Sequence, residues 1–137
     1  MALRCRWIHF KISGDGGAKV TENQEQAALF EWAELSQGRY PELALLHAVP
    51  NGGIRDGRTA AILKRTGVKA GVPDICLPVP KNGFGSLYIE LKRRKGGAVS
   101  VNQRMWLNAL KTAGNKAVIC KGWEEARDEI IKYLEGA

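Results

Sequence analysis

Two carboxylates and a lysine lie in two neighbouring apolar segments near the middle of the chain. Asp74 follows a proline at the start of one segment, and Glu90 and Lys92 stand two residues apart in the next. Because side chains alternate between the faces of a strand, Glu90 and Lys92 share one face and Leu91 points to the other. The short intervening loop predicts an antiparallel pair of strands, which brings Asp74 beside Glu90.

Two adjacent carboxylates and an ammonium group are typical of a site for a hard divalent cation. Mg²⁺ and Mn²⁺ prefer oxygen ligands, and neighbouring carboxylates repel each other unless a cation lies between them. Such a cation can polarise a phosphoryl oxygen and lower the pKa of a bound water. Lys92 would place a positive charge beside the attacking water or the developing phosphorane. The alternative is structural: Asp74 caps a turn, and Glu90 and Lys92 are solvated side chains.

The charge balance favours a polyanionic partner. The 137 residues, enough for one domain, include 21 Lys and Arg and 14 Asp and Glu, a net charge of +7. This balance fits nucleic acid before an anionic membrane, although a basic protein without such a partner remains an alternative. No apolar run reaches the roughly 20 residues that span a bilayer, and we expect neither a secretory signal nor a membrane partner. Three scattered cysteines predict neither disulfides nor a zinc ribbon, and fit a reducing cytosol: Cys5, Cys76 and Cys120.

Apolar spacing and breaker residues predict the elements that position these groups. Helices are expected over about 21–36, 58–66, 100–113 and 123–134, and strands over 43–49, 74–77, 87–92 and 117–120. Capping boxes are predicted at Thr21 with Gln24 and at Ser100 with Gln103. His47, in an apolar run, is expected to be a core residue. The order predicts a mixed α/β domain, with residues 1–20 as an arm that contains a possible strand at 7–12.

Several blocks of the sequence resemble the PD-(D/E)xK nuclease signature in the form of the virus-type replication–repair nuclease (VRR-NUC) family. The signature blocks are GVKAGVPD at 67–74 and YIELK at 88–92. Further blocks follow the family's order: Glu22 with Gln26, PNGG at 50–53 with Arg55, and Ser100 with Gln103 and Trp106. The resemblance covers about residues 21–120. It implies a restriction-endonuclease-like αβββαβ core with a mixed sheet flanked by helices, in a nuclease domain over 21–137.

The resemblance also implies roles for the residues of the two strands. Asp74 and Glu90 would bind Mg²⁺ or Mn²⁺, and Leu91 would add its backbone carbonyl. Lys92 would be the catalytic lysine. No small-molecule cofactor is expected.

Roles for three helix residues follow from the same resemblance. Glu22 would hold the metal or its water, and Gln26, one turn further on, would order that water or a neighbouring side chain. For both, an exposed polar helix face is the alternative. Gln103 would orient the lysine or the substrate, but its capping-box role competes, and one side chain is not expected to hold both roles fully.

Basic and glycine-rich segments are the expected substrate contacts. The amides of Asn51, Gly52 and Gly53 could approach a phosphate, with a plain turn as the alternative. Cations that could follow the DNA backbone are Arg55, Arg58, Lys64, Lys69, Arg93, Arg94 and Lys95.

Together these features predict a Mg²⁺- or Mn²⁺-dependent endonuclease that hydrolyses DNA phosphodiester bonds. The resemblance implies branched DNA, such as flaps or Holliday junctions, in replication, repair or recombination. We expect a homodimer, because two sites related by a two-fold axis suit a junction. The expected location is the cytoplasm of a bacterial or phage-infected host cell. A non-catalytic basic DNA-binding module and an RNA-directed nuclease remain the alternatives.

Overall fold

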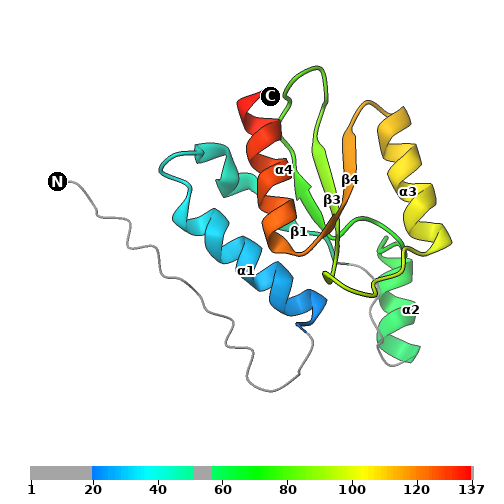
Figure 1. The fold of residues 1–137 in the computed structure, drawn as a ribbon. Helices are drawn as coiled ribbons and strands as arrows, with labels where there is room; N and C mark the ends of the chain where they lie inside the picture. Colours follow the sequence, from blue (N-terminus) through cyan, green and yellow to red (C-terminus); the bar gives the residue numbers. More distant parts are fainter. Residues whose placement is uncertain (1–19, 51–56, 137) are drawn as a thin grey trace.

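A four-stranded mixed sheet forms the centre of the structure (Figure 1). The computed structural model describes residues 20–50 and 57–136, so the possible strand at 7–12 lies outside the described residues. The strands lie side by side in the order β1 (His47–Ala48), β2 (Ile75–Leu77), β3 (Leu87–Lys92) and β4 (Lys116–Lys121). Strand β2 is antiparallel to β1 and β3, whereas β4 is parallel to β3. The predicted antiparallel pairing of 74–77 with 87–92 is confirmed.

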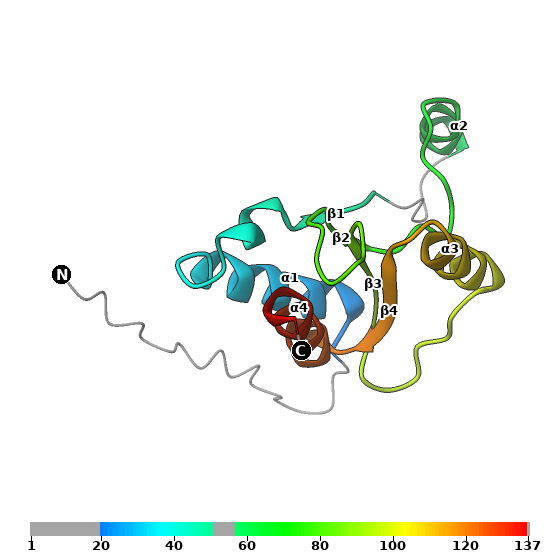
Figure 2. The same cartoon turned by 90° about the horizontal axis from the view of Figure 1, so that it is seen from above.

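Helices cover the two faces of the sheet unequally. Helices α1 (Glu22–Leu35) and α4 (Trp123–Glu135) pack on one face, and α3 (Val101–Thr112) lies on the other (Figure 2). On the same side as α3, the short helix α2 (Gly57–Arg65) lies at the periphery. Apart from α2, the element order matches the predicted αβββαβ core, followed by α4. No helix of the described residues is long and apolar enough to cross a membrane.

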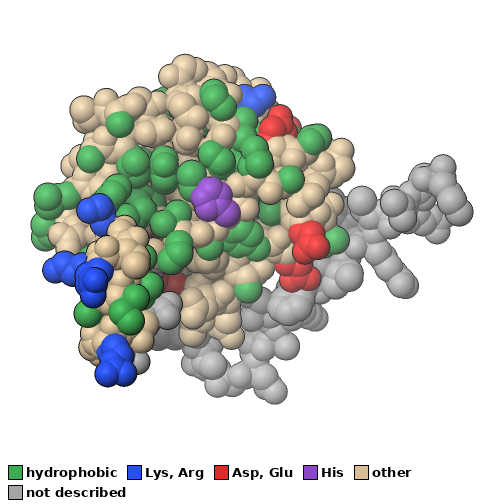
Figure 3. All heavy atoms as spheres, turned by 180° about the vertical axis from the view of Figure 1, so that it is seen from behind, with side chains coloured by type: hydrophobic (Ala, Val, Ile, Leu, Met, Phe, Trp, Pro, Cys, Tyr) green, Lys and Arg blue, Asp and Glu red, His purple; other side chains and the backbone are tan. Residues whose placement is uncertain are grey.

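Alternation along β3 separates the core from the candidate site. Leu87, Ile89 and Leu91 are almost completely buried against α1 and α4, where they join Ile75 and Leu77 of β2. Each such side chain contributes roughly 1.5–3 kcal/mol when it is removed from water. The other side chains of β3, at positions 88, 90 and 92, therefore face the opposite side of the sheet. That side is less covered, and Figure 3, which views it from behind, shows hydrophobic side chains gathered on it.

Local signals explain where the two long predicted helices begin. Thr21 and Gln24 form both hydrogen bonds of a capping box at the start of α1. Ser100 and Gln103 do the same for α3. Each box satisfies two backbone N–H groups that the first turn of a helix leaves without partners. Both predicted capping boxes are confirmed.

The segment predicted as a strand at 43–49 folds differently. It contains the 3₁₀ helix η1 (Pro41–Leu45), and only His47 and Ala48 form a strand. Leu43 and Leu46, three residues apart, are the buried members of the run, a spacing that fits a 3₁₀ turn rather than a strand. The prediction that His47 is a core residue is also wrong: its side chain is exposed, and Nδ1 lies 2.9 Å from the Leu45 carbonyl.

Candidate active site

Asp74 lies immediately before β2, where that strand meets both of its neighbours. Its carboxylate Oδ2 accepts the backbone N–H of Leu91 at 2.9 Å. On the other side, the N–H of Val49 donates to the Asp74 carbonyl at 2.8 Å. The Ile75–Ile89 register, extended by one residue, places Asp74 opposite Glu90. The pairing expected from the hairpin is therefore present.

The carboxylate of Glu90 is buried but only half satisfied. The residue is 1% exposed. Its Oε1 lies 3.3 Å from Lys92 Nζ and accepts a hydrogen bond from Gln103 Nε2 at 2.9 Å. Its Oε2 is buried and has no hydrogen-bond partner among the described residues. A buried acceptor without a partner costs roughly 1–3 kcal/mol, so this oxygen is suited to a ligand that the protein itself does not supply.

Burial changes the acidity of Glu90. Loss of water around the carboxylate and the negative charge of Asp74 raise the pKa of Glu90 from 4.5 to about 7, against the opposing effect of Lys92. A positive charge beside the two carboxylates would favour the ionised form. The site is therefore electrostatically prepared for a cation.

The side chain of Lys92 is held along its full length. The residue is 6% exposed. Its stem passes against Gly97, where an added Cβ would lie 3.1 Å from Lys92 Cβ and 3.2 Å from Cδ. Such contacts are tighter than ordinary van der Waals packing, so Gly97 leaves just enough space for the stem. Sequence reasoning missed Gly97, because nothing in the local pattern of the sequence indicates this contact.

Gln103 makes two contacts through the two ends of its amide. Its Oε1 accepts the N–H of Ser100 at 2.9 Å, which completes the capping box. Its Nε2 donates to Glu90 at 2.9 Å. An amide carries an acceptor and two donors on different atoms, so the cap does not prevent the contact to Glu90, and the role of Gln103 in orienting the lysine or the substrate stays a prediction. The start of α3 is thereby coupled to the carboxylate.

The acidic residue that α1 buries is Glu25, which the sequence analysis did not single out. Glu25 is completely buried. Its Oε1 accepts Arg94 Nε at 3.2 Å, and its Oε2 accepts the backbone N–H of Trp123 at 2.8 Å. This carboxylate therefore caps α4, whose own N-cap is a glycine. Helical spacing with the buried Leu29 and Ala33 was the signal that could have found it.

Glu22 and Gln26 lie on α1 as predicted, without a contact to the two strands. Glu22 is exposed and Gln26 is partly buried. Within residues 20–50 and 57–136, no hydrogen bond or ion pair joins either of them to Asp74, Glu90 or Lys92. In Figures 1 and 2 the first turn of α1 lies near the end of β3. Their roles remain predictions.

The expected phosphate-binding residues outside 57–73 fall into three groups. Arg94 is paired with Glu25 and, through a second nitrogen at 3.1 Å, with Glu124. Arg93 donates to the Gly96 carbonyl at 3.1 Å, and Lys95 is exposed. The third group lies outside the described residues: Asn51, Gly52, Gly53 and Arg55. The structure therefore gives Arg94 a role in holding the loop after β3.

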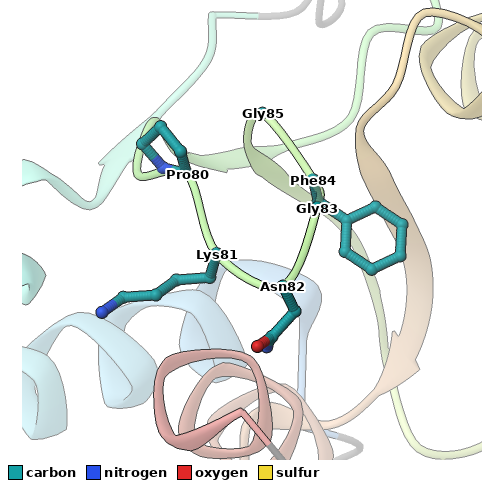
Figure 4. Close-up of a pocket in the computed structure, with 6 residues that line it drawn as sticks. All are labelled: Pro80, Lys81, Asn82, Gly83, Phe84 and Gly85. Atoms are coloured by element: carbon teal, nitrogen blue, oxygen red, sulfur yellow. The ribbon is translucent and has the colours of Figure 1, made fainter.

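A hollow lined by residues 80–85 lies in the hairpin between β2 and β3 (Figure 4). The side chain of Asn82 points to α4 and donates to the Tyr133 carbonyl at 3.2 Å. The hollow lies at the start of β3, whereas Glu90 and Lys92 lie at its end. Its lining includes no carboxylate, histidine or cysteine, so we assign no catalytic role to it.

Comparisons with known proteins identify the family and agree with the fold. The family model of the VRR-NUC domain matches residues 18–124, a range that includes both carboxylates and the lysine. A solved structure described as a VRR_NUC domain protein superposes with a TM-score of 0.73 and 26% sequence identity, covering 88% of this chain and 93% of that chain. No curated protein matches the sequence. Since the family model spans most of the chain and the fold agrees, the chain belongs to the VRR-NUC domain family, a family of nucleases.

Proposed function

We propose that this protein is a Mg²⁺- or Mn²⁺-dependent endonuclease that hydrolyses DNA phosphodiester bonds. The observation that carries the proposal is the buried Glu90 carboxylate, with one oxygen unpartnered among the described residues and with Asp74 and Lys92 beside it. A protein that only binds DNA gains nothing from two carboxylates facing a phosphate, because like charges repel. The arrangement therefore favours catalysis over the alternative of a basic DNA-binding module.

The donor set fits a hard divalent cation. Asp74 and Glu90 offer carboxylate oxygens, and Leu91 can add its backbone carbonyl. In an extended strand the N–H and C=O of one residue point to the same edge, and the N–H of Leu91 points to Asp74. When bound there, Mg²⁺ or Mn²⁺ supplies Lewis acidity toward the phosphate and a water of lowered pKa.

The remaining side chains orient the site and stabilise charge. The ammonium group of Lys92, fixed 3.3 Å from Glu90, places a positive charge where the pentavalent phosphorus carries its extra negative charge. Such preorganised charge contributes a few kcal/mol to the transition state. Gln103 holds Glu90 Oε1, which fixes the direction of the unpartnered Oε2. Glu22 and Gln26 remain candidates for ordering the attacking water.

We extend the proposal to branched DNA and a homodimer. Two copies related by a two-fold axis would present two sites to a four-way junction, which has matching symmetry. The segment that would pair the two copies is the apolar part of the N-terminal arm, which lies outside the described residues. Its apolar residues are Trp7, Ile8, Phe10 and Ile12. This part of the proposal therefore rests on the sequence.

Cleavage of supercoiled plasmid with MgCl₂, MnCl₂ or EDTA tests the nuclease assignment. We expect cleavage with either metal and none with EDTA. Lys92→Ala should be inactive, whereas Lys111→Ala should be active, since Lys111 is exposed in the last turn of α3 at the far end of the sheet. Binding of DNA without cleavage under any condition would instead support the binding module.

Matched substrates separate the finer alternatives. Linear duplex, flap and four-way junction DNA, each with an RNA counterpart, should be cut in the order junction or flap, then linear DNA, then RNA. Preferred cleavage of the RNA set would make the enzyme an RNA-directed nuclease. Light scattering at micromolar concentration tests the dimer, and a monomer that cuts linear and branched DNA equally would refute the junction preference.

A further inference from the structure

We propose that α2 is a DNA-backbone-binding helix, which holds the substrate strand beside the cleaved phosphodiester through Arg58 and Arg65. This inference rests on the proposed nuclease function and adds a contact surface to it. Packing against the rest of the domain does not explain why α2 is a stable helix. The helix has nine residues, none of them buried, and isolated helices shorter than about 12–15 residues are marginal in water.

The charges of α2 are suited to a polyanion. Residues 57–73, which Asp56 precedes and Asp74 follows, contain no acidic residue and four cations: Arg58, Lys64, Arg65 and Lys69. None of these cations forms an ion pair within the described parts of the chain, whereas Arg39, Lys81 and Lys116 elsewhere do. Viewed from behind in Figure 3, Lys and Arg side chains gather at the lower left, where α2 lies.

Helix stability does not explain the position of Arg58. Lys64 and Arg65 lie in the last turn of α2, where cations interact favourably with the helix dipole. Arg58 lies in the first turn, where a positive charge opposes the dipole. An external anion would compensate for this unfavourable placement.

The outward stripe of α2 has the spacing of a backbone contact. Arg58, Ile62 and Arg65 are four and three residues apart, so they share one face of the helix, and all three are exposed. Thr59 and Leu63, which are partly buried, lie roughly 110° around the helix from this stripe. At 1.5 Å per residue the two arginines lie about 10 Å apart along the axis, far enough to neutralise separate phosphates.

The segment that contains α2 begins and ends beside the candidate site, although α2 itself lies at the periphery. The segment that contains α2 leaves the sheet after Val49 and returns at Asp74, and these two residues are joined by a backbone hydrogen bond of 2.8 Å. Both ends of the segment therefore start from the carboxylate site. A second copy of the chain is a poorer occupant, because two such stripes facing each other across a two-fold axis would repel.

The test is the salt dependence of DNA binding, measured by anisotropy of a labelled linear duplex in EDTA between 50 and 200 mM NaCl. Each lost phosphate contact reduces the slope of log K against log[salt] by about 0.9. Arg58→Gln with Arg65→Gln should therefore reduce the slope by about 2. Between 50 and 200 mM NaCl the DNA affinity of this variant should fall by a factor about 12 times smaller than that of wild type. Arg58→Lys with Arg65→Lys should restore most of the slope.

A charge-matched control removes two exposed cations at the other end of the sheet, Lys111→Gln with Lys132→Gln. Lys111 ends α3 near the start of β4, and Lys132 lies in the last turn of α4. This variant should keep the wild-type slope. Circular dichroism should show that all variants are folded, since the substituted side chains are exposed.

The inference would be overturned by an unchanged slope in the Arg58 and Arg65 variant, by an equal decrease in the control, or by conversion of a wild-type dimer to a monomer without a change in slope. Loss of binding to anionic phospholipid vesicles, with DNA binding intact, would also overturn it. The plasmid assay is independent of these outcomes. A wild-type protein that does not cleave but shows the α2-dependent slope would refute the nuclease proposal alone.

Discussion

Replacement of Glu90 by glutamine should stabilise the metal-free protein at neutral and alkaline pH. In the folded state the pKa of Glu90 is about 7, against an ordinary value of 4.5. A tenfold difference in proton affinity corresponds to about 1.36 kcal/mol, so ionising this buried carboxyl destabilises the folded protein by about 3 kcal/mol. The residue is 1% exposed, so screening by solvent reduces this figure little.

The direction of the effect follows from proton linkage. Because the folded state binds this proton more tightly than the unfolded state, the contribution of Glu90 to stability is fully present below about pH 4.5. It decreases as the pH rises and is lost above about pH 7. Glutamine does not ionise, so Glu90→Gln should lack this decrease.

Urea unfolding in EDTA at pH 5, 6, 7 and 8 measures the effect. The difference in unfolding free energy between Glu90→Gln and wild type should increase by about 2.5 kcal/mol from pH 5 to pH 8. Thermal unfolding should show a relative change of roughly 10 °C. Glu22→Gln serves as the control, because it removes one exposed carboxylate from α1 and leaves the buried carboxyl of Glu90 in place.

Magnesium or manganese should oppose the loss of wild-type stability that occurs as the pH rises. Binding to the ionised carboxylates stabilises the folded state by mass action, so the metal should raise wild-type stability most at pH 8 and raise that of Glu90→Gln little. Parallel pH profiles for wild type and Glu90→Gln in EDTA would refute the reasoning, because the buried carboxyl would then not be the titrating group.

Four further substitutions test the site. Lys92→Ala should abolish cleavage while the circular dichroism spectrum and most of the DNA affinity are retained; wild-type turnover would remove Lys92 from the mechanism. Asp74→Asn should weaken Mn²⁺ binding measured by calorimetry, and by removing charge it should raise metal-free DNA affinity; unchanged Mn²⁺ affinity would contradict its role as a ligand. Gln103→Ala should reduce the unfolding free energy by about 1–3 kcal/mol, because a helix cap and a hydrogen bond to Glu90 are lost together, and it should lower kcat; a loss of stability with normal kcat would leave Gln103 as a cap only. Gly97→Ala should lower kcat by more than its loss of thermal stability accounts for, because its Cβ would press on the Lys92 stem. Steady-state kinetics that match wild type would show that the lysine tolerates displacement.

The parts of the fold that could be predicted depend on short-range rules. Strand alternation and a short hairpin were sufficient to place Asp74, Glu90 and Lys92 together. The run at 43–49 could not be assigned, because a continuous apolar segment has no periodicity that separates a strand from a 3₁₀ turn. His47 was misplaced for the same reason.

Long-range contacts account for what the sequence did not reveal. The partners of Glu25 lie 69 and 98 residues away along the chain, so no local pattern indicates why a carboxylate is buried there. The fit of Gly97 to Lys92 depends on the path of a loop. Arg94, expected to bind phosphate, forms ion pairs with Glu25 of α1 and Glu124 of α4, which lie far from it along the chain.

The Glu25 contact links catalytic competence to the order in which the chain is made. The backbone carbonyl of Lys92 accepts the N–H of Gly122, and Glu25 accepts the N–H of Trp123. A nascent chain that has emerged from the ribosome only as far as residue 120 holds both carboxylates and the lysine, but lacks the residues that fix the loop around them. Such a chain should neither fold stably nor cut nucleic acid, so the proposed activity should arise only after the residues of α4 have emerged from the ribosome.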